Sequence, residues 1–279
     1  MKEENKNKKE FKLAGFTIWR ICAYFIIYSF IGHIIETVFM IITTGVWECK
    51  QSLVYGPFCF IYGIGAITMI LCLQSFKGRT ITVFSGGFFV GSVMEYSLSW
   101  IEEAILKVRW WDYSNYPFNI NGRICLAFSF FWGLLAIMLI MNINPFIDKI
   151  INFCIKKFKR NILKTVTVTF FILLVIDIFF TIFSINMFFT RISNEHGIEI
   201  KGQEGYMDIC NKLYENKFIS LVTNKFFSDQ KMVMTFPELK VTKKNGETDF
   251  VRDILSDVKS YYLKIDLTKK MQLEKNNLR

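Results

Sequence analysis

The sequence lacks the short motifs that mark nucleotide hydrolysis, zinc binding, nucleic-acid recognition or established catalysis. Neither GxGxxG nor GxxxxGK[ST] occurs, which excludes an ATPase that carries its own phosphate-binding loop. The cysteines include no CxxC pair, so a zinc or redox site built on cysteines is not expected. We therefore expect no catalytic residues, no metal, no cofactor and no nucleic-acid partner, and a chain that is not itself an enzyme.

What the sequence has instead is long hydrophobic runs. Of its 279 residues 52% are hydrophobic and 17% aromatic, and the mean hydropathy is +0.31, too apolar for an ordinary soluble enzyme. Each run reaches the roughly 20 residues that a helix needs to cross a bilayer, and none alternates as a membrane strand would. The sequence predicts an all-α, polytopic membrane bundle of five transmembrane helices, at about 18–43, 53–76, 80–106, 124–143 and 166–189.

The distribution of Lys and Arg predicts the orientation of these helices. Cations gather in the amino-terminal segment 1–15, at Lys77 and Arg79, and between Asp148 and Lys164. Such residues are retained on the cytoplasmic face of the cell membrane. The amino terminus is therefore expected in the cytoplasm and, after five crossings, the tail is expected on the outer side. A cleaved signal peptide is the alternative for the first run, which is however longer than the usual apolar core of such peptides. The net charge of +10 is interpreted as anchoring the protein to anionic lipid rather than to nucleic acid.

Two regions flank or interrupt the transmembrane domain, expected at 16–190. The segment 145–164 places apolar residues at helical spacing with cations on the other side, which predicts an amphipathic cytoplasmic helix, a plain charged connector being the alternative. The tail, 191–279, is predicted to form a small mixed extracytoplasmic domain with strands at 232–241 and 248–254 around an Asn245-Gly246 turn. A disulfide between Cys49 and Cys210 is left open.

Ionisable residues lie inside the apolar runs, where they are costly and mark either bundle contacts or a pathway. They recur at helical spacing, which places them on one face of each helix. The first run carries Ser29, His33, Glu36 and Thr43, and the third carries Ser92, Glu95, Ser99 and Glu102 with Glu103 beside them. We predict that the two faces meet and line a polar cavity or substrate pathway with His33, Glu36, Glu95, Glu102 and Glu103. A packing pair between His33 and Glu36 is the alternative for those two residues.

The loop Arg109–Arg123 is rich in aromatic and amide side chains. An interfacial belt explains any single ring, but it does not need Asp112 or Arg123. We expect Arg109 and Arg123 to pair with Asp112, Glu102 or Glu103, and the loop to fold over the outer end of the bundle and close a cavity lined by Glu36 and Glu95. The expected residues of this outer-loop cap are Trp111, Asp112, Tyr113, Asn119 and Arg123.

Several short stretches resemble one bacterial family. They are Tyr28–Glu36 (YSFIGHIIE), Tyr55–Phe58 followed by Ile61–Gly63, Met94–Tyr96 with Glu103, Trp111–Ser114, Asn121–Arg123 and Phe131–Gly133. In this order they resemble the ABC-transporter type IV permease family, also called CmpB-like, found mainly in Firmicutes, over about residues 20–200. The family usually has an aromatic residue where this chain has His33. The resemblance implies a multi-pass permease in a lipid bilayer and a separate ATP-binding subunit docked near Lys77–Arg79 and Asp148–Lys164.

Three functions remain open at this point. The first is a permease-like subunit that moves an unidentified solute or ion and forms a homo- or hetero-oligomer. The second is a membrane-embedded enzyme or accessory protein acting on lipid or cell-envelope intermediates, with Glu95 or Asp112 as the base and Arg123 holding a phosphate. The third is a sensor or scaffold whose tail binds a partner.

Overall fold

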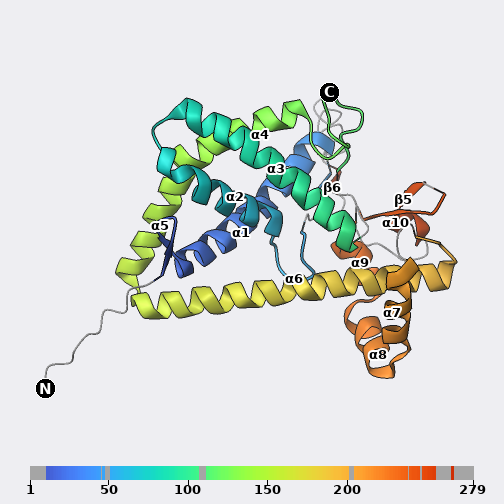
Figure 1. Ribbon diagram of the computed structural model, residues 1–279. Helices are drawn as coiled ribbons and strands as arrows, with labels where there is room; N and C mark the ends of the chain where they lie inside the picture. The colour runs from blue at the N-terminus through green and yellow to red at the C-terminus, as the bar shows by residue number, and fades with distance from the viewer. Residues whose placement is uncertain are drawn as a thin grey trace, which may run out of the picture.

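The protein is mainly helical (Figure 1). The computed structural model describes residues 11–44, 46–47, 51–106, 111–200, 204–237, 239–245, 247–255 and 265–266. The bundle consists of α1 (Ile18–Thr44), α2 (Phe60–Leu73), α3 (Thr80–Leu106), α4 (Leu126–Met138), α5 (Asn144–Lys157) and α6 (Arg160–His196), with a 3-10 turn η1 (Gln74–Phe76) and a π-helical turn η2 (Leu139–Ile143). The tail contains α7 (Glu204–Glu215), α8 (Lys217–Phe226), α9 (Asp229–Thr235), β4 (Lys240–Thr242), β5 (Thr248–Phe250) and α10 (Val251–Ile254).

The strands are short and pair antiparallel. The pairs are β1 (Lys12–Leu13) with β2 (Phe16–Thr17), β3 (Val46–Trp47) with β6 (Ile265–Asp266), and β4 with β5. The β4–β5 pair matches the hairpin expected around Asn245, but both strands are shorter than expected. Residues 229–235 form α9 and residues 251–254 form α10, so helices occupy the outer parts of both predicted strands.

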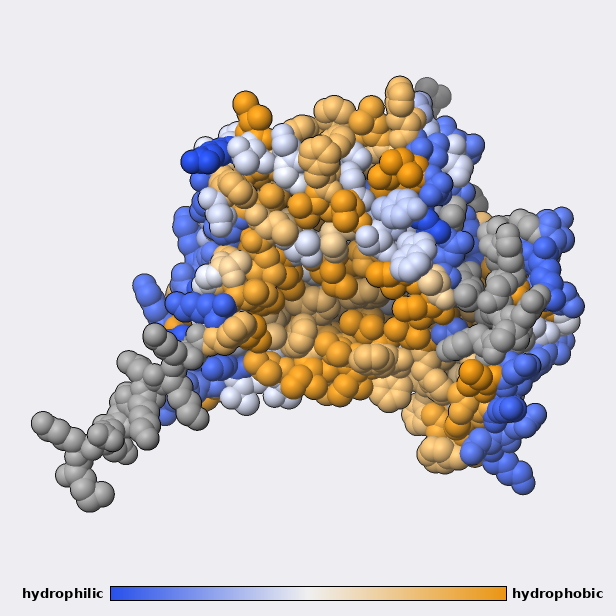
Figure 2. Space-filling model, viewed as in Figure 1, coloured by the Kyte–Doolittle hydropathy of each residue, from blue (hydrophilic) through white to orange (hydrophobic). Residues whose placement is uncertain are grey.

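Among the described residues, four helical segments are long and apolar enough to cross a membrane. They are Ile18–Thr43, Thr80–Ile105, Leu126–Lys157 and Arg160–His196. At most 28% of the residues in their most apolar windows are buried inside the protein, so most of these residues are at least partly exposed at its surface. Figure 2 shows the result, a broad hydrophobic surface over the middle of the molecule with hydrophilic side chains at both ends. A lipid bilayer is the environment that such a surface requires.

The predicted span 53–76 differs from the other four. Its helical part covers only Phe60–Phe76, about 25 Å at 1.5 Å per residue. Pro57 disfavours a helix at the preceding residue, and Gly56 has a φ of +79°, so residues 51–59 run as an irregular loop. The backbone of this loop is bound by its neighbours: Cys59 N–H donates to the Ser29 carbonyl (2.9 Å), and Val54 N–H donates to the Thr181 hydroxyl (3.0 Å).

The predicted helices 124–143 and 145–164 are one rod in the structure. Helix α4 passes through η2 into α5, and the rod ends at Lys157, before residues 158–159 turn the chain into α6. Pro145 lacks an N–H group for an ordinary helical bond, which agrees with a π-helical turn just before it. Arg20 anchors α5 on α1 by an ion pair of 2.6 Å with Asp148.

Helix α6 extends beyond the predicted span 166–189 at both ends. Its 37 residues measure about 55 Å, well over the roughly 30 Å of a hydrocarbon core. The large apolar side chains between Val166 and Phe180 include many exposed ones, whereas residues 184–192 are all buried. Ile185, Phe188 and Phe189 pack in one cluster with residues of α9, β4 and α10. The second half of this apolar run is therefore the core of the tail domain rather than a lipid-facing surface.

Candidate functional site

Helices α3 and α4 approach each other closely because glycine lines their contact. A Cβ atom added at Gly87 would lie 2.2 Å from Cβ of Ala136, and one added at Gly91 would lie 2.5 Å from Cβ of Trp132. The step Gly87-x-x-x-Gly91 thus works as a small-residue contact between membrane helices. This close contact brings the polar face of α3 against α4, where the hydroxyl of Ser92 donates to that of Ser129 at 2.7 Å.

Glu95 is the centre of the polar face of α3. Its side chain is held on both carboxylate oxygens: the Tyr113 hydroxyl donates to Oε1 at 2.9 Å and the Trp132 indole N–H donates to Oε2 at 2.8 Å. The residue is only 7% exposed. Two donors from two different segments make a buried carboxylate tolerable, and they connect α3 to α4 and to the loop between these helices.

The cap loop is folded by its own backbone and amides. Tyr113 N–H donates to the Gly122 carbonyl at 2.7 Å, and the Asn119 side chain donates to the carbonyls of Ser114 (3.1 Å) and Tyr116 (2.9 Å). Gly122 has a φ of +66°, and a Cβ there would lie 2.4 Å from Oδ1 of Asp112. This compact turn fixes the direction of Tyr113.

Tyr113 extends from the cap loop into the helix bundle and contacts α3 and α4. Its ring stacks on Phe128 of α4 with centroids 4.5 Å apart, and its hydroxyl reaches Glu95. Burial raises the pKa of Tyr113 above its ordinary value, and the negative charge of Glu95 raises it further. The hydroxyl therefore keeps its proton and remains a donor to the carboxylate.

Arg123 connects the end of the cap loop to α3. Its guanidinium forms an ion pair with Glu103 and donates to the Ser99 hydroxyl at 3.0 Å, and it lies over the Tyr96 ring. The Trp111 indole donates to the Arg123 carbonyl at 3.0 Å. Of the three acids expected as partners of Arg123, the structure pairs it with Glu103. Asp112 accepts instead from the Ser114 backbone and hydroxyl, within the loop.

Glu36 on α1 is bound by a tyrosine that helical spacing in the sequence does not identify. The Tyr62 hydroxyl of α2 donates to Oε1 of Glu36 at 2.6 Å. Tyr62 and Trp132 both stand in stretches that carry the family resemblance, which is the signal that could have identified them. We call these two hydrogen-bonded groups together the polar layer: Glu36 with Tyr62, and Glu95 with Tyr113 and Trp132.

Two further expected site residues, Glu102 and His33, lie on the same helices as Glu95 and Glu36 respectively. Glu102 is 7% exposed on the same face of α3, and no described residue forms a hydrogen bond with its Oε2 atom. Arg109, an expected partner, lies outside the described residues, as do Trp110 and Cys49. His33 is half-buried one turn before Glu36. Within the described part of the chain, no group of three or more His, Cys, Asp or Glu side chains is placed to hold a metal ion.

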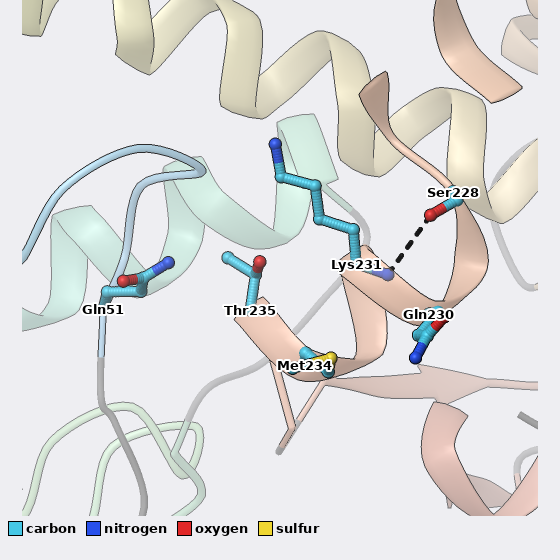
Figure 3. A pocket seen from close by; sticks show the side chains of 6 residues that line it. All are labelled: Gln51, Ser228, Gln230, Lys231, Met234 and Thr235. Carbon is cyan, nitrogen blue, oxygen red and sulfur yellow. Dashed lines mark hydrogen bonds between the residues drawn. The ribbon is translucent and has the colours of Figure 1, made fainter. Parts of the chain in front are cut away.

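A separate hollow of about 360 Å³ lies where the tail meets the loop before α2 (Figure 3). Gln51 faces it from the loop, and Lys231, Met234 and Thr235 face it from α9. Figure 3 shows the Lys231 side chain extending away from Met234 toward the bundle. Its ammonium group lies 4.2 Å from the centre of the Tyr55 ring, and the Tyr55 N–H donates to Asp177 of α6 at 3.3 Å. The tail thus contacts the loop that precedes α2.

Comparison with known families identifies one match. Residues 23–182 match the family described as "Putative ABC-transporter type IV". This range contains α2 to α5 and most of α1 and α6, and hence every residue of the polar layer and of the cap. No curated protein and no solved structure matches the chain.

Proposed function

Because the chain belongs to the ABC-transporter type IV family, we propose that it is a permease-like subunit that moves a solute or ion along the polar layer. The observation that carries the proposal is Glu95, a carboxylate buried among apolar helices and held by donors from both the cap and α4. The cap would close the layer at one end of the bundle. Opening would require Tyr113 to leave Glu95, which would free the carboxylate for a ligand.

The acidic side chains of the layer favour a cation or a protonated solute. Glu36 and Glu95 supply carboxyl groups within the layer, Glu102 lies on the same face of α3 as Glu95, and the guanidinium of Arg123 is already paired with Glu103. When these acids are ionised, a site lined with them and with neutral phenol and indole donors attracts positive charge and repels anions. A simple packing contact would not need carboxylates at this depth.

Orientation and partner follow from the distribution of basic residues. The α2–α3 turn with Lys77 and Arg79 and the end of α5 with Lys156 and Lys157 lie at the same end of the molecule as the start of α1 (Figure 1). We assign this end to the cytoplasm and the cap and tail to the outside. A separate ATP-binding subunit would then dock on the basic end, since this chain contains no phosphate-binding loop of its own.

Affinity purification from native membranes in a mild detergent tests the partner. We expect a protein with a GxxxxGK[ST] motif to copurify, and its recovery to fall when Lys156 and Lys157 are replaced by Glu. Replacing Lys243 and Lys244 of the tail by Glu is the matched control and should leave recovery unchanged. Repeated purification without any nucleotide-binding protein would contradict the ABC-transporter part of the proposal.

The geometry favours this function over the membrane enzyme. That alternative needs Arg123 to hold a phosphate. Arg123 is only 8% exposed, and its guanidinium already binds Glu103 and Ser99. It also needs Glu95 or Asp112 as a base, and both carboxylates already accept hydrogen bonds. Turnover of a lipid-linked substrate by the purified protein would reverse this preference.

A further inference from the structure

We propose that helices α7 and α8 form an arm that lies on the membrane surface, with its apolar side on the lipid next to the point where α6 leaves the bilayer. This inference goes beyond the transport function and does not depend on it. It depends only on the long apolar helices crossing a bilayer.

The outward side of the arm is apolar, which is unusual for a helix in water. On α8, Phe218 is 74% exposed and Leu221 is 63% exposed, whereas Thr223 on the opposite side and Phe227 just after the helix are buried. On α7, Ile209 is 57% exposed and lies one turn from Leu213, at 38%. Each helix therefore buries one side in the tail and presents a second apolar side that no described residue covers.

The position of the arm indicates what covers this side. Helices α7 and α8 project beside α6 on the tail side of the bundle (Figure 1). In Figure 2 the hydrophobic side of this projection is turned toward the hydrophobic surface of the membrane helices, and its hydrophilic side is turned away. Phe179 and Phe180 are the last large exposed apolar residues along α6 before it enters the tail core. The apolar surface of the arm thus continues that of the lipid-facing helices.

The charges of the arm fit the headgroup region of a bilayer. Lys212, Lys217 and Lys225 are exposed on the two helices that carry the apolar side. Lysine stems can cover apolar surface while the ammonium groups bind lipid phosphates, and a helix of this kind lies in the plane of the interface. Apolar side chains with flanking lysines favour lipid over a second copy of this chain, whose own arm would bring the same cations together.

Site-specific photocrosslinking of the full chain in lipid nanodiscs tests this inference. Benzoylphenylalanine would be introduced at Phe218 or Leu221 in nanodiscs of phosphatidylcholine and phosphatidylglycerol, irradiated, and the products analysed by intact mass. The control position is Glu215, which is exposed on α7 about 160° around the helix axis from Leu213. These are surface positions, so the variants are expected to fold.

We expect lipid adducts at 218 and 221 and none at 215. Crosslinks at 218 or 221 to a second copy of the chain, seen as a covalent dimer, would overturn the inference in favour of a protein interface. Failure to form any adduct at 218 and 221 would also overturn it, because it would place both side chains in water. Adducts of equal yield at all three positions would indicate nonspecific contact and would likewise contradict an oriented arm.

Discussion

At the scale of single residues, the polar layer is organised by aromatic donors rather than by opposite charges. Glu36 accepts from Tyr62, and Glu95 accepts from Tyr113 and Trp132. Each of these donors is a neutral phenol or indole group. Arg123 is kept apart from these acids by its ion pair with Glu103. This separation allows the charge and the packing of Glu95 to be tested independently.

Replacing Glu95 by Gln should preserve folding and impair transport. The amide keeps the shape of the side chain and an oxygen for Tyr113 or Trp132, whereas Glu95→Ala leaves both buried donors without an acceptor, at about 1–3 kcal/mol for each. We therefore expect the melting temperature of the purified protein to fall clearly with Ala and little with Gln. Flux of the transported solute or ion into proteoliposomes that contain the copurified ATP-binding subunit should fall with both Glu95→Gln and Glu95→Ala. Normal flux with Gln would exclude Glu95 from the pathway.

The raised pKa of Tyr113 predicts how stability depends on pH. A group whose pKa is higher in the folded state contributes stability that is complete below the unfolded value, 10.0 here, and is lost as pH rises above it. Thermal unfolding should therefore show a loss of stability above pH 10 that is less steep in Tyr113→Phe. Tyr116→Phe is the control for loss of a phenol from the same loop. An equally steep loss in the Tyr113 variant would mean that other tyrosines cause it.

The residues of the site were only partly predictable. Helical spacing put Glu95 and Glu102 on one buried face of α3, because a costly charge within an apolar run must avoid lipid. Spacing cannot say which rings on other helices will face that carboxylate, so Tyr62 and Trp132 were missed. The partner of Arg123 was undecided among three acids, since the choice depends on a loop shape set by Gly122 at positive φ.

At the scale of elements, α6 serves two environments with one apolar sequence. Lipid and a protein core both select apolar side chains, so the sequence does not mark the point near Thr181 where exposed residues give way to buried ones. For the same reason, the predicted span 166–189 included residues that belong to the tail core. Arg191 fixes this second half of the helix: its Nε atom donates to Asp229 at 2.6 Å and its Nη2 atom donates to the Phe227 carbonyl at 2.9 Å.

Replacing Arg191 by Lys should loosen the tail from α6. Lysine keeps the charge but cannot reproduce the forked donor geometry at a residue that is 4% exposed, so we expect a loss of about 2 kcal/mol or more. The measurement is the rate of limited proteolysis within residues 204–255, with the membrane helices as the resistant internal standard. Lys243→Met is the control, because it removes an ion pair with Asp249 at the surface and should change the rate little. Equal effects of the two variants would contradict a structural role for Arg191.

At the scale of the whole molecule, the number of crossings depends on α2. Its helical part is short of the bilayer thickness by several ångströms. The loop 51–59 precedes it between α1 and α6, with Leu53 fully buried against Phe25 and Leu174. Irregular backbone is tolerated at membrane depth only where protein covers it and supplies its hydrogen bonds. Residues 53–76 can therefore complete a fifth crossing as a buried loop followed by a short helix.

Reporter fusions at the two ends of the chain decide between four and five crossings. Five crossings place the amino terminus and the tail on opposite sides of the membrane, whereas four place them on the same side. With the basic end inside, we expect a fluorescent protein to be active at the amino terminus and an alkaline phosphatase to be active after residue 255. A phosphatase inserted at Gly78, in the turn after α2, should be inactive, because that turn carries Lys77 and Arg79. An inactive phosphatase after residue 255 would mean that residues 53–76 do not cross the membrane and that the chain crosses it only four times. The cap and the basic end would then have to be reassigned relative to the tail.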